Sequence, residues 1–468
     1  MHKYGRDLRN PIDDGQQFIM QAGTDVGELA RQLFPGGVDA APPDAYAYQI
    51  SVEKTKAFIR QGESIIYEAA FQFEGVLCAL DILVRKGNAW YAFEVKSSTS
   101  VKAQHVQDAA LQYFVTTNCG LLVHDISIVF LNNQYVRKGA LDTQQLFSTQ
   151  SVVDEAKALQ DFVNDKIQAF KTMLVQRNVP VVDIGPHCFT PYGCDFTNHC
   201  FSHMPSEDSI FELPDRTAWK LYADGYKALH HIPDDYELSD KVNMQLLHHR
   251  TGEVFIDKAQ IRKFLLPLTH PLYFFDFETI MPGIPEFDES KPYQQIPFQY
   301  SLHVQRTRYA ALEHFSFLGD GIRDPRSELL ISMLQHLGTT GSILCYNMNF
   351  EKQRIKELAT LYPNFEKELL AINERVVDLM IPFARRWYYH PDFKGSYSIK
   401  AVLPVLIPEL RYDVLPIQEG GMASLAYVQL KWQDDETISL QRQQLMDYCK
   451  MDTLAMVKIL EYLRQVIS

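Results

Sequence analysis

The segment "YFFDFETI", residues 273–280, places two carboxylates inside a run of aromatic and apolar residues. Such runs usually form buried strands, in which unpaired carboxylates are costly. Side chains two positions apart share one face of a strand, so Asp276 and Glu278 would point together while Phe275 and Phe277 pack into the core. Divalent metal ions would offset the repulsion between the two carboxylates, because hard cations prefer clustered oxygens. The alternative is a pair on the solvated face of an edge strand.

Two later segments add polar residues that the same site could use. "GSILCYNMNFEKQRIKELA" predicts a short buried strand followed by a helix, with Asn347 and Glu351 near the helix N-terminus. "LMDYCKMDTLAMVKIL" predicts a helix that places Tyr448 and Asp452 one turn apart on one face. Asp378, in "RVVDLMIPF", is a secondary candidate near the site. Each of these residues also has a structural explanation, as a helix charge, an interface residue or a surface charge.

Taken in order, the three motifs resemble the DEDD exonuclease superfamily of the tyrosine type, whose members are DnaQ-like enzymes with an RNase H-like fold. The resemblance covers about residues 266–468. It implies hydrolysis of phosphodiester bonds from a free 3′ end at a two-metal site that holds Mg²⁺ or Mn²⁺. The implied metal ligands are Asp276, Glu278, Glu351 and Asp452. Tyr448 would orient the attacking water, and Glu351 stands where the family normally has Asp.

Candidates for substrate contacts lie between the second and third motifs. "RRWYYHPDFKGSYSIK", residues 385–400, interleaves basic and aromatic side chains, which is typical of sites that bind single-stranded nucleic acids. Lys394 and Lys400 are the phosphate-binding candidates, because they lie in or beside a loop, and Asn347 is a further substrate-binding candidate. The aromatic residues also fit a helix with buried Trp387 and Tyr388, followed by a turn at Gly395.

A second candidate centre lies in the β-rich segment "YEAAFQFEGVLCALDILVRKGNAWYAFEVKSS", residues 67–98. A Gly-Asn dipeptide separates two strand-like runs, which is typical of a hairpin. The hairpin would bring Asp81 beside Glu94, and Glu94 and Lys96 would share a face of their strand. An exposed hairpin with an ordinary Glu–Lys pair is the alternative.

The D…E-x-K pattern resembles the core of the PD-(D/E)XK nuclease fold in its RecB-like form. The resemblance implies that Asp81 and Glu94 are metal ligands and that Glu68 is an extra acid. Lys96 would position water or stabilise the charge that develops on phosphate.

Two other segments extend this resemblance. The helix "HVQDAALQY" lies where RecB-like proteins carry a Gln/Tyr motif, with Asp108 in place of Gln and Gln112 in place of Tyr. Gln112 is a substrate-binding candidate on this basis. The helix "GTDVGELA" resembles the first motif of the family, with Gly27 in place of His.

Three cysteines form a C-x5-C-x5-C pattern in "PHCFTPYGCDFTNHCF": Cys188, Cys194 and Cys200. In CRISPR-associated and AddB-type relatives of RecB, three late cysteines and one N-terminal cysteine hold an iron–sulfur cluster. The resemblance therefore implies a 4Fe-4S cluster or a zinc site here. Histidines that could complete such a site are His2, His187, His199 and His203. A loop of buried thiols without metal is the alternative.

Composition and length exclude several classes of protein. The chain has 468 residues, so two or three domains are expected. The sequence contains no apolar run that predicts a membrane span, and its N-terminal segment does not resemble a signal peptide, so we expect a cytoplasmic protein. The net charge of −13 argues against a generally basic DNA-coating protein, but it is compatible with a nuclease, whose centre uses carboxylates.

We therefore predict an α/β protein with three parts. They are an N-terminal PD-(D/E)XK restriction-endonuclease-like domain at residues 1–205, a helical connector at 206–265 and a C-terminal RNase H-like DEDD exonuclease domain at 266–468. The combination resembles an uncharacterised bacterial family of two-domain nucleases. The predicted function is that of a metal-dependent 3′–5′ exonuclease, with DNA preferred over RNA as partner. The alternatives are a nucleic-acid-binding or scaffold protein with one or both centres inactive, and an RNA-processing exonuclease.

Overall fold

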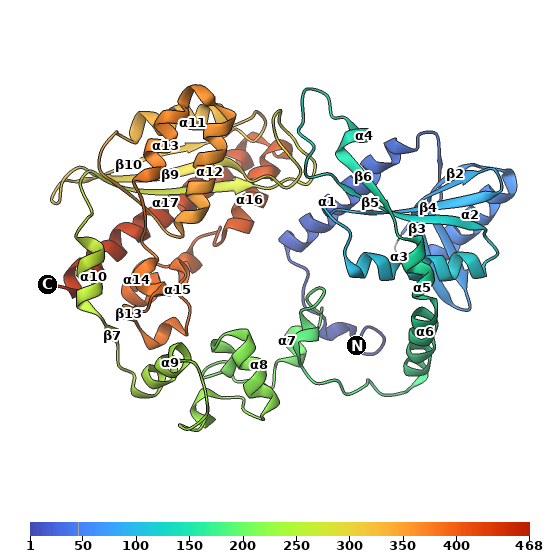
Figure 1. Ribbon diagram of the computed structural model, residues 1–468, viewed down its shortest axis with the longest axis horizontal. Coiled ribbons are helices and arrows are strands. Elements are labelled where there is room, and N and C mark those ends of the chain that lie inside the picture. Colours follow the sequence, from blue (N-terminus) through green and yellow to red (C-terminus); the bar gives the residue numbers. More distant parts are fainter. Residues whose placement is uncertain (45) are drawn as a thin grey trace. The chain divides into compact units, whose positions relative to one another are not determined.

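The computed structural model describes residues 1–44 and 46–468 (Figure 1). Both parts of the chain combine sheets with helices, which confirms the prediction of an α/β protein. The chain divides into two compact units: the first comprises Met1–Thr197 and Met281–Gln294, and the second comprises Asn198–Ile280 and Gln295–Ser468. The helical connector predicted at 206–265 lies within the second unit.

A six-stranded mixed sheet forms the centre of the first unit, in the order β1-β2-β3-β4-β5-β6. Its strands are β1 (Val38–Asp39), β2 (Ile65–Phe73), β3 (Val76–Lys86), β4 (Ala89–Lys96), β5 (Val123–Leu131) and β6 (Phe147–Ser151). Strands β2, β3 and β4 form an antiparallel meander, whereas β4 pairs in parallel with β5. Lys86 pairs with Ala89, so the Gly-Asn dipeptide between them forms the predicted two-residue hairpin.

Helices pack on both faces of this sheet, and each face has its own buried apolar cluster. These helices are α1 (Asp14–Ala30), α2 (Tyr48–Gln61), α3 (Ala103–Asn118), α4 (Thr143–Leu146), α5 (Val153–Ala158) and α6 (Gln160–Val175). A further short helix, α7 (Thr197–Cys200), crosses the division between the units. Apolar periodicity predicts one helix over residues 151–176, and this is wrong. Leu159 leaves helical geometry (φ −90°, ψ 3°) and separates α5 from α6.

The first unit includes a segment that the chain supplies from between two strands of the second unit. In this segment the main-chain carbonyls of Pro285 and Glu286 accept hydrogen bonds from Arg137 Nη1 at 2.8 and 2.9 Å. The hydroxyl of Tyr293 donates to the carbonyl oxygen of Ser97 at 2.8 Å. Side-chain and main-chain bonds from residues far apart in the sequence therefore complete the first unit.

The second unit is built on a five-stranded sheet in the order β10-β9-β8-β11-β12. Its strands are β8 (Leu272–Ile280), β9 (Ile296–Gln305), β10 (Leu312–Leu318), β11 (Ser342–Cys345) and β12 (Val376–Asp378). β8 is the central strand, antiparallel to β9 and parallel to β11. Phe275 and Phe277 are buried in the core, as predicted. Because β8 is central, Asp276 and Glu278 do not lie on an edge strand.

Ten helices and a small sheet complete the second unit within the described residues. The helices are α8 (Asp215–Ala223), α9 (Asp240–Thr251), α10 (Lys258–Leu265), α11 (Arg326–His336), α12 (Met348–Leu361), α13 (Glu366–Glu374), α14 (Ile381–Ala384), α15 (Ile399–Leu406), α16 (Gly420–Gln429) and α17 (Asp435–Val466). The small sheet pairs β7 (Phe255–Ile256) with β13 (Tyr388–Tyr389). Helices α11, α12 and α13 pack on the phenylalanine side of β8, and α17 lies on its carboxylate side. In the described part of the chain, no helix has the length and apolar character needed to span a membrane.

A glycine controls how β11 joins the strand that carries the two carboxylates. Gly341 precedes the first pair of this ladder, adopts φ +90°, and a Cβ placed on it would lie 2.1 Å from the carbonyl oxygen of Pro271. Positive φ and backbone overlap both oppose any larger residue. We expect Gly341→Ala to lower the free energy of unfolding by about 3 kcal/mol in urea denaturation.

The matched control is Gly421→Ala in α16, where an added Cβ meets no atom within 4 Å. Alanine favours a helix over glycine by about 1 kcal/mol, so this variant should be as stable as the original chain or slightly more stable. Equal losses of stability in the two variants would show that the close approach at Gly341 has no energetic importance.

Candidate functional site

The predicted site residues of the second unit gather where its parallel strands end. Strands β8, β11 and β12 run in parallel, so their carboxyl ends meet at one edge of the sheet, where ligands of open α/β sheets bind. Asp276 and Glu278 lie near the end of β8, Asn347 stands directly before the helix that follows β11, and Asp378 ends β12. Sequence segments about 100 residues apart are thereby brought to one edge.

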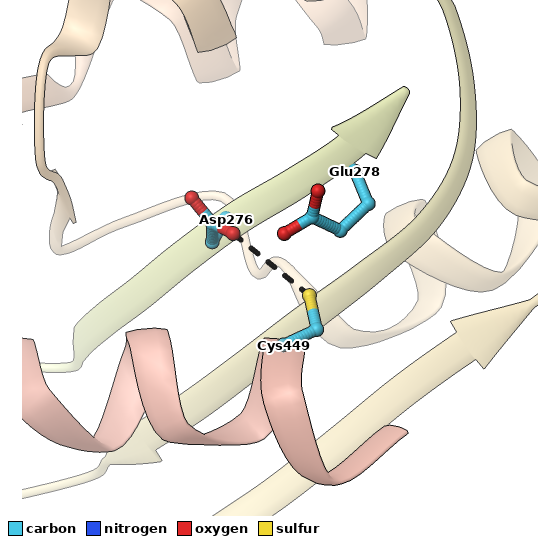
Figure 2. Close-up of side chains that lie close together, drawn as sticks. All are labelled: Asp276, Glu278 and Cys449. Atoms are coloured by element: carbon cyan, nitrogen blue, oxygen red, sulfur yellow. Dashed lines mark hydrogen bonds between the residues drawn. The ribbon is translucent and has the colours of Figure 1, made fainter. Parts of the chain in front are cut away.

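Asp276 and Glu278 form a compact group with a third side chain, Cys449 of α17. One potential ligand atom from each of the three lies within 4.8 Å of the other two. The thiol of Cys449 is 3.8 Å from Oδ2 of Asp276. Figure 2 shows the two carboxylates turned toward each other on β8, with the thiol pointing at them from the helix. Glu278 and Cys449 are buried and Asp276 is partly accessible, so the group has the donor atoms and the access of a metal site.

Glu351 adds a third acid at the first turn of α12. It is 2% exposed, and its Oε2 atom has no hydrogen-bond partner within the described residues. Burial, together with the charge of the nearby Asp378 carboxylate, raises its pKa to about 8. In turn its charge helps to raise the pKa values of Asp276 and Glu278, although burial and Asp452 contribute more. Glu351 lies outside the three-atom group but acts on it electrostatically.

Asp452 is the fourth acid, and it is held by a tyrosine that the motifs do not include. The hydroxyl of Tyr412 donates to Asp452 Oδ1 at 2.6 Å, and both side chains are buried. Burial raises the pKa of Asp452 to about 6, against the hydrogen bonds of Tyr412 and Tyr448 and the charge of Lys400. Tyr448 and Asp452 thus share the face of α17 that the helical spacing predicts. Neither Tyr412 nor Cys449 was identified by sequence reasoning, because no motif contains Tyr412 and Cys449 resembles an ordinary core cysteine.

Lys400 supplies the positive charge at the accessible side of this acidic group. Its side chain is exposed, and its Nζ lies 5.6 Å from the ring centroid of Tyr412 and 5.5 Å from that of Tyr448. Its charge lowers the pKa values of Glu278 and Asp452. Lys400 is therefore placed where a phosphate approaching the carboxylates would meet a cation.

Other candidates between the motifs have structural partners. Lys394 lies 3.4 Å from Oε1 of Glu212. Tyr388 is 1% exposed, so it is buried as the alternative expects, but it lies in β13 and the expected helix is wrong. Trp387 is only partly buried. Oδ1 of Asp378 accepts hydrogen bonds from the main-chain N–H groups of Asn347, at 3.0 Å, and Met380, at 2.9 Å. Asp378 therefore holds the turn in which Asn347 has φ 75°.

The first unit brings its predicted residues together differently. Ile82 pairs with Phe93, which places Asp81 level with Glu94 on the next strand. Nζ of Lys96 is 2.9 Å from Oε1 of Glu94, and Nε2 of Gln112 donates to the other Glu94 oxygen at 2.7 Å. Both oxygens of Glu94 are therefore hydrogen-bonded within the protein.

The remaining charges around this cluster are also paired. Nζ of Lys96 lies 2.9 Å from Oδ2 of Asp108, and the main-chain N–H of Val95 donates to Asp81 at 2.6 Å. Burial and the charge of Glu94 raise the pKa of Asp81. Glu68, at φ 52°, lies 3.3 Å from the guanidinium of Arg31. Gly27, where the resemblance predicts a histidine, lies in α1.

The three cysteines of the predicted site do not all belong to one unit. Cys188 and Cys194 belong to the first unit and Cys200 to the second, and none of the three forms a disulfide within the described residues. The main-chain N–H of Cys194 donates to the carbonyl of Cys188 at 2.8 Å. His2 lies 3.8 Å from Asp195, next to Cys194. The iron–sulfur or zinc site remains a prediction.

Comparisons with known proteins identify relatives without an assigned activity. Residues 273–398, which include Asp276, Glu278 and Glu351, match the family model described as "Domain of unknown function (DUF2779)". The chain is 28% identical over 216 residues to "Uncharacterized protein MG366 homolog" of Mycoplasma pneumoniae, covering 42% of this chain and 32% of the relative. It is 25% identical over 242 residues to "Uncharacterized protein UU173" of Ureaplasma parvum, covering 47% and 35%. The matches thus span about a third of the length of these curated relatives. No solved structure matches the chain.

The raised pKa values predict how stability depends on pH without metal. Burial raises the pKa of Asp452 to about 6 and that of Glu351 to about 8, so the folded chain holds more protons than the unfolded chain below these values. Linkage then makes the free energy of unfolding fall as the pH rises from about 4 to about 8. We expect the Tm in EDTA to fall over this range, and Mn²⁺ to reverse the fall, in differential scanning calorimetry.

Asp276→Asn removes one of the repelling charges, so its Tm should depend less steeply on pH than that of the original chain. Asp235→Asn neutralises an exposed carboxylate and serves as the control. If all three proteins show the same dependence on pH, the acidic group is not the cause.

The hydrogen bond of Tyr412 predicts an effect on metal affinity. Outer partners that orient a ligating carboxylate typically contribute about 10-fold to 100-fold in affinity. We therefore expect Tyr412→Phe to weaken Mn²⁺ binding by this factor in isothermal titration calorimetry. The control, Tyr397→Phe, changes a half-exposed tyrosine of the same unit and should leave the affinity unchanged. Equal affinities in both variants would exclude a role for Tyr412 in orienting Asp452.

Proposed function

We propose that the chain is a metal-dependent nuclease whose hydrolytic centre lies in the second unit. One observation carries the proposal: Asp276, Glu278 and a buried thiol converge at the end of the central strand. The largest charge effects on Asp276 are those of Asp452, Glu278 and Glu351, and all three are negative and raise its pKa. Crowded carboxylates without a cation are costly in a protein interior. Divalent ions would offset this cost.

The residues present fit such ions. Carboxylate oxygens are the ligands that Mg²⁺ and Mn²⁺ prefer, and Glu351 has a buried oxygen without a hydrogen-bond partner in the described chain. The residues that would hold the ions are Asp276, Glu278, Glu351 and Asp452. When bound, such ions lower the pKa of water and stabilise the leaving oxygen of a phosphodiester.

The other side chains of the centre have roles that follow from their positions. Tyr448 lies on the same face of α17 as Asp452 and would orient the attacking water. Lys400, exposed beside the two tyrosines, would hold a substrate phosphate. Tyr412 fixes Asp452 through its 2.6 Å hydrogen bond and acts as a positioning residue.

The substrate and the direction of cleavage come from the resemblance to DEDD exonucleases. That resemblance is supported by the order of the motifs and by the sheet, which joins an antiparallel half to a parallel half at β8. It favours 3′–5′ hydrolysis, with DNA proposed before RNA as the substrate.

A second candidate places cleavage in the first unit, at a centre of the RecB-like type. The meeting of Asp81, Glu94 and Lys96 across the β3–β4 hairpin favours it. Both oxygens of Glu94 are already hydrogen-bonded and Lys96 is shared with Asp108, so this centre has less need of a cation. We therefore assign hydrolysis to the second unit.

The test compares wild type, Asp276→Asn and Glu94→Gln on nucleic acids labelled at the 5′ or the 3′ end. Single-stranded DNA, duplex DNA and RNA are each incubated with Mg²⁺, Mn²⁺ or EDTA. Loss of a metal ligand withdraws several kcal/mol of transition-state stabilisation, so Asp276→Asn should lower the rate by roughly a thousandfold. Glu94→Gln should retain activity.

Three outcomes are distinguishable in this assay. Loss of activity in Asp276→Asn alone supports the second unit as the centre, and loss in Glu94→Gln alone transfers the activity to the first. No metal-dependent product from the wild-type chain would overturn the nuclease proposal and leave a nucleic-acid-binding or scaffold protein.

A further inference from the structure

Cys449 is the one member of the three-residue group that the proposed hydrolysis does not use. Its side chain is fully buried, and its thiol lies 3.8 Å from Asp276 Oδ2. Figure 2 shows that it points from α17 toward both carboxylates of β8. A sulfur atom in this position changes which cations the group can bind.

We propose that Asp276, Glu278 and Cys449 together form a binding site for a thiophilic divalent cation of the zinc class. The inference rests on the proposed function in one respect: the same two carboxylates would bind the zinc-class ion and the Mg²⁺ or Mn²⁺ of hydrolysis. A zinc-class ion bound here would compete with Mg²⁺ or Mn²⁺ and would inhibit hydrolysis. Cys449 would then determine the metal specificity of the centre.

The geometry fits a tetrahedral ion. Zinc binds thiolate sulfur at about 2.3 Å and carboxylate oxygen at about 2.0 Å, so tetrahedral ligands of these two kinds are roughly 3.5 Å apart. The distance of 3.8 Å between Cys449 Sγ and Asp276 Oδ2 is close to this value. On binding, the thiol loses its proton to solvent and a sulfur–metal bond forms. Hard ions such as Mg²⁺ prefer oxygen and gain little from the sulfur atom.

A second observation also indicates a cation at this place. Oε2 of Glu351 is buried and has no hydrogen-bond partner in the described part of the chain, and its charge acts on both Asp276 and Glu278. Arg354 is the positive side chain that lowers the pKa of Glu351, but it makes no hydrogen bond to Oε2, and a cation beside these carboxylates would give that oxygen a partner. If Cys449 only filled space in the core and no cation bound here, the missing partner of Glu351 Oε2 would have no explanation.

The test measures binding of Cd²⁺, a zinc-class ion whose thiolate complexes absorb in the ultraviolet. Cd²⁺ is titrated into the full chain as wild type, Cys449→Ser and Cys345→Ser. Cys345 is a buried thiol of the same unit outside the three-residue group, so its variant is the matched control. Thiols elsewhere, including Cys188, Cys194 and Cys200, contribute equally to all three proteins.

We expect Cys449→Ser to lose one bound Cd²⁺ and its share of the thiolate absorption, while Cys345→Ser behaves like wild type. Even outer partners of a metal contribute about 10-fold to 100-fold in affinity, so loss of a ligand atom should weaken Cd²⁺ binding at this site by at least about 100-fold. Mn²⁺ affinity should stay within about twofold of wild type, because manganese prefers the oxygen ligands.

Two further variants keep the test decisive. Asp276→Asn/Glu278→Gln should lose the same absorption although Cys449 is intact, and Cys449→Ala, with its folding checked by circular dichroism, should match the serine variant. Identical titrations of wild type and Cys449→Ser, or absorption that survives in the carboxylate double variant, would overturn the proposal. No nucleic acid is present, so a chain without nuclease activity still gives a clear result here.

Discussion

The second unit depends on an unfavourable arrangement, the concentration of negative charge on its central strand. Asp276 and Glu278 lie on β8, and Glu351 and Asp452 act on them from two helices. Each of these carboxylates has a raised pKa, chiefly because of burial. The hydrogen bond from Tyr412 and the nearby charge of Lys400 compensate only part of this cost. The remaining cost of burying these carboxylates would be relieved by binding a cation, and this would favour binding.

The two acidic clusters show how the same residue types can have different chemistry. In the first unit each oxygen of Glu94 has a protein donor, and Asp81 accepts a main-chain N–H. The carboxylates of that cluster therefore have hydrogen-bond donors within the protein, without an ion. In the second unit the thiol of Cys449 is the donor to Asp276, and a thiol is a weak donor. Incomplete hydrogen bonding, rather than the number of acids, distinguishes the centre that we propose to bind metal.

Much of the fold was predictable because its signals are local. A run of aromatic and apolar residues marks β8, a Gly-Asn dipeptide marks the β3–β4 hairpin, and Asp257 caps α10 by accepting the Gln260 N–H at 3.0 Å. The same local rules place Tyr448 and Asp452 on one face of α17. The local rules fail at Leu159, because the helical spacing of apolar residues continues through the break between α5 and α6.

The rest of the site depends on contacts that no local pattern contains. Tyr412 reaches Asp452 across 40 positions of sequence, and Cys449 reaches Asp276 across 173. A tyrosine or a cysteine has the same local signature in a core as in a site, and only the packing of α17 against β8 distinguishes the two. Family motifs contain the residues that are known to act in that family. They therefore identify the carboxylates and omit the thiol. Because a ligand is defined by where its donor atom lies, the sulfur beside Asp276 has to be judged by geometry and tested with a metal that prefers sulfur.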